Sequence, residues 1–312
     1  MKALVTGVAG FIGSHLAERL LSDGLEVVGI DCFTDYYPRE TKQRNLGALL
    51  GRTGFRLVEA RLQDADLAPL LDGVARVYHL AAQAGVRASW GREFACYTEH
   101  NVLATQRLLE AAIASGRPKL VYASSSSVYG DSRTLPLRED GPCRPVSPYG
   151  VTKLAGEHLA SLYHRNHGLD TTSLRFFTVY GPRQRPDMAF HRFLRAARDG
   201  GPVTVFGDGL QTRDFTYVDD IVAAARAAAL SGRAGSVYNV GGGERVALND
   251  VLGMVEEVTG RPLRIQRQEA QKGDMRDTFA DTSAAARELG FHPTVSLREG
   301  LAREWAWLRD ER

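Results

Sequence analysis

The chain has 312 residues, with 39 lysines and arginines against 37 aspartates and glutamates, which gives a formal net charge of +2 at pH 7. Because the basic residues are scattered along the chain, composition offers no electrostatic case for a nucleic-acid partner or a membrane surface. The length is sufficient for one large domain or two modest domains with a full hydrophobic core.

The three cysteines are Cys32, Cys96 and Cys143, and their spacing matches no redox or metal-ligand motif. We therefore expect free thiols in a reducing compartment and no bound metal, with metal ligation as the alternative. No segment has the roughly 18 unbroken apolar residues that a membrane-spanning helix needs, and charges interrupt the apolar N-terminal stretch. These features predict a soluble, cytoplasmic protein.

The first predicted elements are a strand, a glycine-rich turn and a helix. Residues Ala3 to Thr6 are mostly apolar, and the turn Gly7-Val8-Ala9-Gly10-Phe11-Ile12-Gly13 leads into an amphipathic helix through Leu21. The first glycine permits the tight bend, the second lets the backbone approach a pyrophosphate, and the third lets the helix pack closely on the strand. The pattern predicts a dinucleotide site, rather than a purely structural turn, that includes Gly7, Gly10, Phe11, Ile12 and Gly13.

A second strand is predicted from Leu25 to Ile30, with Asp31 at its end. An acidic residue at this position accepts hydrogen bonds from the adenosine ribose, and its charge disfavours a 2′-phosphate. The sequence therefore indicates NAD rather than NADP. A polar, aromatic-rich segment from Thr34 to Arg44 follows, and its composition does not define its role.

Strand and helix patterns alternate up to Phe176, which is typical of a doubly wound parallel α/β sheet. Further strands are predicted at Phe55 to Glu59, Val77 to Leu80, Leu120 to Ala123 and Thr171 to Phe176, with intervening helices at Thr98 to Ser115 and Tyr149 to Arg165. We predict a Rossmann-type NAD-binding domain over residues 1–176 that also takes back part of 212–240.

After Phe176 the elements become shorter and are separated by glycine and proline. Helices are predicted near Phe190 to Arg198, Val246 to Thr259 and Leu297 to Arg309. We expect a smaller α/β substrate domain over residues 177–312. It would close over the carboxyl ends of the strands, where open α/β sheets bind their ligands.

The residues that point to chemistry surround the start of the predicted helix at Tyr149. Ser147 followed by Pro148 is a favourable helix start, and Tyr149 and Lys153 share one helix face. A nearby ammonium lowers the pKa of a phenol from about 10, so Tyr149 could act as a general base. A hydroxyl from the serine run Ser124 to Ser127 could share the proton. The alternative is an ordinary surface pair at i,i+4 spacing.

Together, the glycine-rich turn and Tyr149-x-x-x-Lys153 resemble the extended short-chain dehydrogenase/reductase family, in its nucleotide-sugar epimerase, dehydratase and decarboxylase branch. The resemblance runs from Thr6 through Asp281. It implies bound NAD, with Leu62, Leu80, Ala81, Ala82, Tyr149 and Lys153 at the cofactor, and a homodimer formed through two helices of each subunit. The family's adenine-contacting aspartate maps to Arg61, which either stacks on adenine or makes no contact with it.

The same resemblance places the hydroxyl of the proton network at Ser125. Relatives that eliminate water carry an acidic pair at the positions of Ser126 and Ser127, and decarboxylating relatives carry a glutamate at the second. Because this chain has only hydroxyls there, the resemblance favours simple epimerisation, with Ser125 and Ser126 also contacting the substrate.

Gly181 to Ala189 resembles the substrate loop of UDP-glucuronate 4-epimerases. Arg185 could bind a C6 carboxylate with its planar fork; the alternatives are a solvated loop charge or a diphosphate contact. Thr178 stands where relatives acting on neutral hexoses usually carry asparagine.

Three further substrate contacts follow from the resemblance. Arg87, after His79 to Val86, is either a contact of the substrate's charge or a helix-entry residue. Arg213 is the expected diphosphate contact, and Asp274 lies in the stretch that resembles the ribose-binding segment.

The sequence thus predicts NAD-dependent C4 epimerisation of UDP-glucuronate to UDP-galacturonate through a 4-keto intermediate, with a UDP-sugar as the partner. The alternative is a UDP-glucose/UDP-galactose 4-epimerase. A UDP-glucuronate decarboxylase and a non-catalytic nucleotide-binding module are the remaining alternatives.

Overall fold

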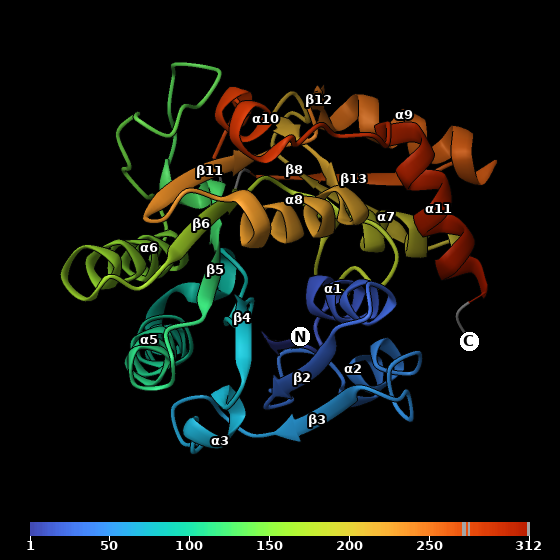
Figure 1. Ribbon diagram of the computed structural model, residues 1–312. Coiled ribbons are helices and arrows are strands. Elements are labelled where there is room, and N and C mark those ends of the chain that lie inside the picture. Colours follow the sequence, from blue (N-terminus) through green and yellow to red (C-terminus); the bar gives the residue numbers. More distant parts are fainter. Residues whose placement is uncertain (270–272, 274, 311–312) are drawn as a thin grey trace.

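The computed structural model describes residues 1–269, 273 and 275–310 (Figure 1). Its centre is a seven-stranded sheet with the strand order β11-β6-β5-β4-β1-β2-β3, in which neighbouring strands run parallel. The strands are β1 (Lys2–Thr6), β2 (Glu26–Asp31), β3 (Phe55–Glu59), β4 (Val74–His79), β5 (Lys119–Ser125), β6 (Thr171–Phe176) and β11 (Ser236–Val240). The order reverses between β1 and β4, as in Rossmann folds. The predicted fold class is confirmed.

Helices cover both faces of this sheet (Figure 1). One face carries α3 (Ala68–Leu71), α5 (Ala104–Ala114) and α6 (Pro148–His167), and the other carries α1 (Phe11–Ser22) and α8 (Val218–Ser231). Parallel strands that are buried on both faces need side chains that are apolar on both, which explains the nearly continuous apolar run of Ala3 to Val5 in β1.

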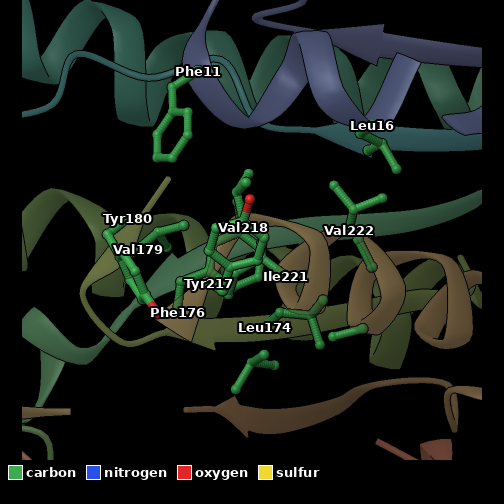
Figure 2. Close-up of a cluster of buried hydrophobic side chains, with 14 of the residues drawn as sticks. Phe11, Leu16, Leu174, Phe176, Val179, Tyr180, Tyr217, Val218, Ile221 and Val222 are labelled. Carbon is green, nitrogen blue, oxygen red and sulfur yellow. The ribbon is translucent and has the colours of Figure 1, made fainter. Parts of the chain in front are cut away.

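The packing of α1 on α8 joins distant parts of the chain. Figure 2 shows Phe11 and Leu16 of α1 facing the Val218 and Val222 side chains of α8, with Leu174 of β6 in the same cluster. A helix from beyond residue 176 and strand β11 therefore both belong to the layers of the main sheet. The predicted domain boundary at residue 176, with part of 212–240 belonging to the first domain, stays a prediction.

The remaining strands form three small two-stranded sheets. They pair β7 (Val179–Tyr180) with β10 (Thr216–Tyr217), β8 (Pro202–Phe206) with β13 (Arg264–Gln268), and β9 (Thr212–Asp214) with β12 (Arg245–Ala247). The helices of this part are α7 (Ala189–Asp199), α9 (Leu248–Thr259), α10 (Ser283–Leu289) and α11 (Leu297–Asp310). Short turns and helices elsewhere are α2 (Arg39–Asn45), α4 (Phe94–Tyr97), η1 (Arg87–Ser89), η2 (Gly91–Glu93), η3 (Thr98–Leu103) and η4 (Ser126–Val128).

Several predicted bounds were wrong. The helix expected over Thr98 to Ser115 is α-helical only from Ala104 to Ala114, because Thr98–Leu103 is π-helical. The helix expected from Val246 begins at Leu248, since Arg245–Ala247 pairs with β9 as a strand. Strand β4 starts at Val74 and ends at His79, so Leu80 lies beyond it. Element ends are the part of a fold that local sequence patterns define least well.

Within the described part of the chain, we find no helix long and apolar enough to cross a membrane. The same residues contain no group of three or more histidine, cysteine, aspartate or glutamate side chains that could hold a metal ion. All three cysteines are free thiols.

Candidate active site

A cavity of about 740 Å³ lies at the carboxyl ends of the central strands, where Gly7 follows β1, Leu80 follows β4 and Ser125 ends β5. This is the switch point of the sheet, where α/β folds of this order bind ligands. The lining also includes Phe206, Gln211 and Leu248 from the C-terminal part.

The lining of this cavity includes every predicted site residue that the structure describes. These are Gly7, Gly10, Phe11, Ile12, Gly13, Asp31, Leu62, Leu80, Ala81, Ala82, Arg87, Ser125, Ser126, Tyr149, Lys153, Thr178, Arg185 and Arg213. Asp274, together with Gln271 and Lys272, lies outside the described residues. Positions spread from residue 7 to residue 213 thus meet in one place.

The glycine-rich turn is packed too closely for side chains at two of its glycines. Gly7 has a φ of +71°, and a Cβ there would lie 2.9 Å from the backbone of Ala81. A Cβ at Gly13 would lie 2.2 Å from the carbonyl oxygen of Gly7. Gly10 precedes α1 without a side-chain cap, and the residues at the start of this helix line the cavity. Such a helix start favours an anion.

The carboxylate of Asp31 is held in place by the backbone around it. Its two oxygens accept hydrogen bonds from Ala9 N at 3.0 Å and from Phe33 N at 2.8 Å. Asn45 of α2 donates to the carbonyl oxygen of Ala9 at 3.0 Å. The helix at the end of the Thr34 to Arg44 segment therefore supports the glycine-rich turn, a role that composition did not reveal.

Helix α6 begins as predicted and carries Tyr149 and Lys153 into the cavity. The Ser147 hydroxyl accepts from Gly150 N at 3.1 Å, and Pro148 stands in the first turn. Lys153 is buried, with its Nζ 4.7 Å from the centre of the Tyr122 ring. The Tyr149 ring meets the Tyr97 ring edge to face, with the two centres 6.3 Å apart. The alternative of a surface Tyr–Lys pair is excluded by this placement.

The electrostatics of Tyr149 differ from the sequence-based expectation. Burial raises the pKa of Tyr149, whereas the charge of Arg185 and then a hydrogen bond with Ser125 lower it. Burial also lowers the pKa of Lys153 to about 7, against the opposing charge of Glu157. A cation that lowers the Tyr149 pKa here is thus Arg185, while burial disfavours the charged form of Lys153.

Two buried polar contacts that sequence reasoning missed hold α6 in place. Asn101, in the π-helical segment, accepts from Gln83 N at 2.7 Å and donates to Gln83 O at 3.0 Å and to the Thr152 hydroxyl at 2.9 Å. Its amide therefore ties the segment after β4 to the residue before Lys153. A π-helical turn of this kind often marks a functional site, but no local sequence motif predicts it.

The second contact is a buried ion pair beneath the serine run. Glu157 accepts from the Ser124 hydroxyl at 2.8 Å and from Arg175 Nη2 at 2.6 Å, and both charged side chains are buried. Glu157 lies one helical turn after Lys153, so this pair fixes the end of β5 relative to the face of α6 that carries Tyr149 and Lys153.

Arg185 and its neighbour Arg183 have different roles. Arg185 lines the cavity and forms a bidentate pair with Asp187, with Nε and Nη2 at 3.0 and 3.1 Å from the two carboxylate oxygens. Arg183 pairs with Glu18 of α1 at 2.7 Å and is not among the described lining residues. Arg185 is therefore a cavity cation rather than a solvated loop charge.

The remaining predicted contacts lie around the same space. The Arg87 guanidinium stacks 4.3 Å above the centre of the Phe206 ring, and Arg213 Nη1 donates to the carbonyl oxygens of Thr212 and Arg276. The idea that Arg61 stacks on adenine finds no support, because Arg61 pairs with Glu99 and Asp64 while Leu62 lines the cavity.

The sequence pattern of the NAD dependent epimerase/dehydratase family matches residues 3–241. The chain belongs to this family. The resemblance that the glycine-rich turn and the Tyr149–Lys153 pair indicated is thereby confirmed.

Two curated relatives and one solved structure resemble the chain over almost its whole length. A Bacillus subtilis (strain 168) protein, "Uncharacterized UDP-glucose epimerase YtcB", is 46% identical over 99% of this chain and 98% of its own. The UDP-glucuronate 4-epimerase of Thermodesulfobacterium geofontis (strain OPF15) is 38% identical over 98% of this chain and 96% of its own. The crystal structure of UDP-glucuronic acid 4-epimerase from Bacillus cereus, in complex with UDP-glucuronic acid and NAD, is 44% identical, with a TM-score of 0.96 over 99% of both chains.

Proposed function

We propose that this protein is an NAD-dependent UDP-sugar 4-epimerase that interconverts UDP-glucuronate and UDP-galacturonate. The observation that carries the proposal is the position of Arg185, a cation that lines the cavity and lowers the pKa of Tyr149. A guanidinium beside the proton acceptor suits a sugar with a carboxylate next to the reacting carbon. The relatives from T. geofontis and B. cereus support the same substrate.

The residues present fit NAD. The turn from Gly7 to Gly13 forms a close-packed cradle, in which a Cβ at Gly7 or Gly13 would clash with the backbone. The start of α1 suits the pyrophosphate. Asp31, held by Ala9 and Phe33, would bind the adenosine ribose. When bound, NAD supplies the acceptor and donor of hydride.

Tyr149 moves the proton at C4 in this proposal. Its phenolate removes the proton of the C4 hydroxyl as the sugar is oxidised, and Ser125 shares that proton through its hydrogen bond. The 4-keto sugar then turns over, and Tyr149 returns the proton when the opposite face of C4 has been reduced. In this proposal Arg213 holds the diphosphate, Arg87 contacts the substrate's charge, and Thr178 and Ser126 contact the sugar. Asp274, outside the described residues, keeps its predicted place at the ribose.

Among the residues that the structure describes, the cavity wall offers no second acid for elimination or decarboxylation. Among the described lining residues the acids are Asp31 and Asp187. The first is bound by backbone N–H groups and the second by Arg185. With hydroxyls at Ser126 and Ser127, one proton acceptor remains at the reacting carbon, which is what epimerisation requires.

We also propose the domain division and location that the sequence pattern and composition predicted, and the homodimer that the family resemblance implies. The division is an NAD-binding part over 1–176 that also takes back part of 212–240 and a substrate part over 177–312, and the location is the cytoplasm. Exposed apolar side chains support the dimer. Leu103 of η3 and Val151 and Leu162 of α6 are all exposed to solvent, and they lie on the two helical segments expected at the interface. Light scattering of the purified protein tests the dimer.

The rival candidate is C4 epimerisation of UDP-glucose, which the name of the B. subtilis relative favours. The experiment is incubation of the NAD-loaded protein with UDP-glucuronate, UDP-galacturonate and UDP-glucose, with the products identified by NMR. We expect interconversion of the two uronates and little change of UDP-glucose. Faster conversion of UDP-glucose would select the rival, and release of carbon dioxide from UDP-glucuronate would identify a decarboxylase.

A further inference from the structure

The arginine that the proposed function assigns to the sugar carboxylate is bound by a carboxylate of this chain. Arg185 and Asp187 form a bidentate pair, with N···O distances of 3.0 and 3.1 Å. The Tyr36 hydroxyl donates to Asp187 Oδ2 at 3.2 Å, although the two residues are 151 positions apart in the sequence. All three side chains line the cavity. Within the substrate loop, Asp187 is thus bound by Arg185 of the same loop and by Tyr36 from the segment after β2.

Burial explains why Arg185 needs this anion. Its side chain is 22% exposed, whereas that of Arg138, in a surface pair with Asp140, is 63% exposed. A guanidinium removed from water is costly unless an anion compensates its charge. Asp187 supplies that charge through two of the N–H groups of Arg185. These belong to the fork that binds a planar carboxylate most strongly.

Asp187 affects charged and neutral ligands differently. A hexuronate carboxylate can replace the Asp187 carboxylate on Arg185, because both are planar anions with the same two acceptors. The charge of Asp187 also opposes a second carboxylate at short range. A neutral hexose carries no such charge, and it leaves the Arg185–Asp187 pair in place.

We propose that Asp187 is a resident counter-ion that competes with the substrate carboxylate for Arg185 and thereby determines how strongly the site prefers a uronate to a neutral hexose. Asp187 acts through Arg185 and is therefore a positioning residue, not a catalytic one. The inference rests on the proposed function, since it takes a UDP-hexuronate as the substrate.

The test measures dissociation constants by calorimetry on the full-length, NAD-loaded protein, in a Tyr149→Phe background that prevents turnover. Asp187→Asn keeps the shape of the side chain and removes its charge. We expect it to lower the Kd of UDP-glucuronate about tenfold, while the Kd of UDP-glucose stays within about twofold. Asp187→Glu retains the charge and should restore the parental ratio of the two constants.

A matched control removes an equal charge elsewhere. Asp140→Asn breaks the exposed pair with Arg138, and neither residue is among the described residues of the cavity wall; it should leave both constants unchanged. Asp187→Ala repeats the charge removal should the asparagine variant fail to fold.

Three results would overturn the inference. A weaker binding of UDP-glucuronate by Asp187→Asn would show that Asp187 orients Arg185 instead of competing for it. An equal change for both sugars would show a structural role, and unchanged constants would show that the pair has no influence on binding. Failure of the proposed function would be seen separately, as wild-type protein that leaves UDP-glucuronate unconverted in the NMR assay.

Discussion

Burial raises the pKa of the Tyr149 hydroxyl, and the guanidinium of Arg185 opposes that rise more than the hydrogen bond with Ser125 does. One cation therefore serves two steps of the proposed reaction, because it can bind the sugar carboxylate and it stabilises the phenolate that removes the proton. Substrate binding and base activation are coupled through the substrate loop. A carboxylate placed on Arg185 would itself weaken this effect on Tyr149, which makes the neighbouring Asp187 part of the same electrostatic balance.

Removal of the proton acceptor should abolish turnover without unfolding the protein. Tyr149→Phe deletes one hydroxyl at the cavity wall, and we expect the rate of UDP-glucuronate epimerisation to fall by about 10²- to 10⁴-fold. NAD content and thermal stability should stay near those of the parent, as absorbance and calorimetry would measure. Near-parental turnover would refute the role of Tyr149.

Arg185→Ala should lower kcat/KM for UDP-glucuronate by roughly 100-fold, the size of effect expected when one partner of a buried charged contact is removed. It should also move the rising limb of the pH–rate profile to higher pH. Arg185 lowers the pKa of Tyr149, so its loss raises that pKa and leaves less phenolate at a given pH. Arg183→Ala is the matched control, because this loop arginine pairs with Glu18. Equal losses in the two variants would contradict a specific role of Arg185.

The buried amine of Lys153 should make stability depend on pH. Burial lowers its folded-state pKa to about 7, below the value of about 10.4 for an unfolded chain. Between these values the unfolded state binds more protons, so the free energy of unfolding should rise with pH, by up to about 1.4 kcal/mol per unit from this residue. Lys153→Met should lose this part of the slope in urea denaturation of the cofactor-free protein. Parallel curves for parent and variant would show that Lys153 is not buried as an amine.

Glu157→Gln should be strongly destabilising. It leaves the Arg175 charge buried without its anion, which costs about 3 to 5 kcal/mol when one member of a buried pair is removed. The control is Glu299→Gln, which breaks an i,i+4 surface pair with Arg303 and should cost less than about 1 kcal/mol. Urea denaturation compares the two, and similar losses would show that the Glu157–Arg175 pair is not buried as described.

A methyl group at Gly13 should disrupt the dinucleotide cradle. Its Cβ would lie 2.2 Å from the carbonyl oxygen of Gly7, so we expect Gly13→Ala to cost about 1 to 3 kcal/mol of stability through overpacking and to lose bound NAD. Gly253, inside α9, has open space where a Cβ would lie, and Gly253→Ala should stabilise the protein by about 0.5 to 1 kcal/mol. Retention of NAD by Gly13→Ala, as measured after gel filtration, would contradict the assigned cradle.

Much of the fold followed from rules that act over a few residues. The Gly7 to Gly13 turn, the Ser147-Pro148 helix start and the i,i+4 spacing of Tyr149 and Lys153 depend on local backbone geometry. The side chains of neighbouring residues determine such geometry. The alternation of strand and helix patterns then restricts the sheet to a doubly wound, parallel arrangement. For these features the sequence was sufficient.

The electrostatics of the site depended on contacts between distant parts of the chain. The sequence places Lys153 beside Tyr149, but packing against Tyr122 buries the amine, and the substrate loop brings Arg185 close enough to act on the phenol. Likewise, only the fold brings Tyr36 to Asp187. The sign and size of a pKa shift follow from burial and from the charges nearby in space. The sequence by itself therefore identified candidate residues such as Tyr149, Lys153 and Arg185, and the tertiary structure decided which side chains lie close enough to act on one another.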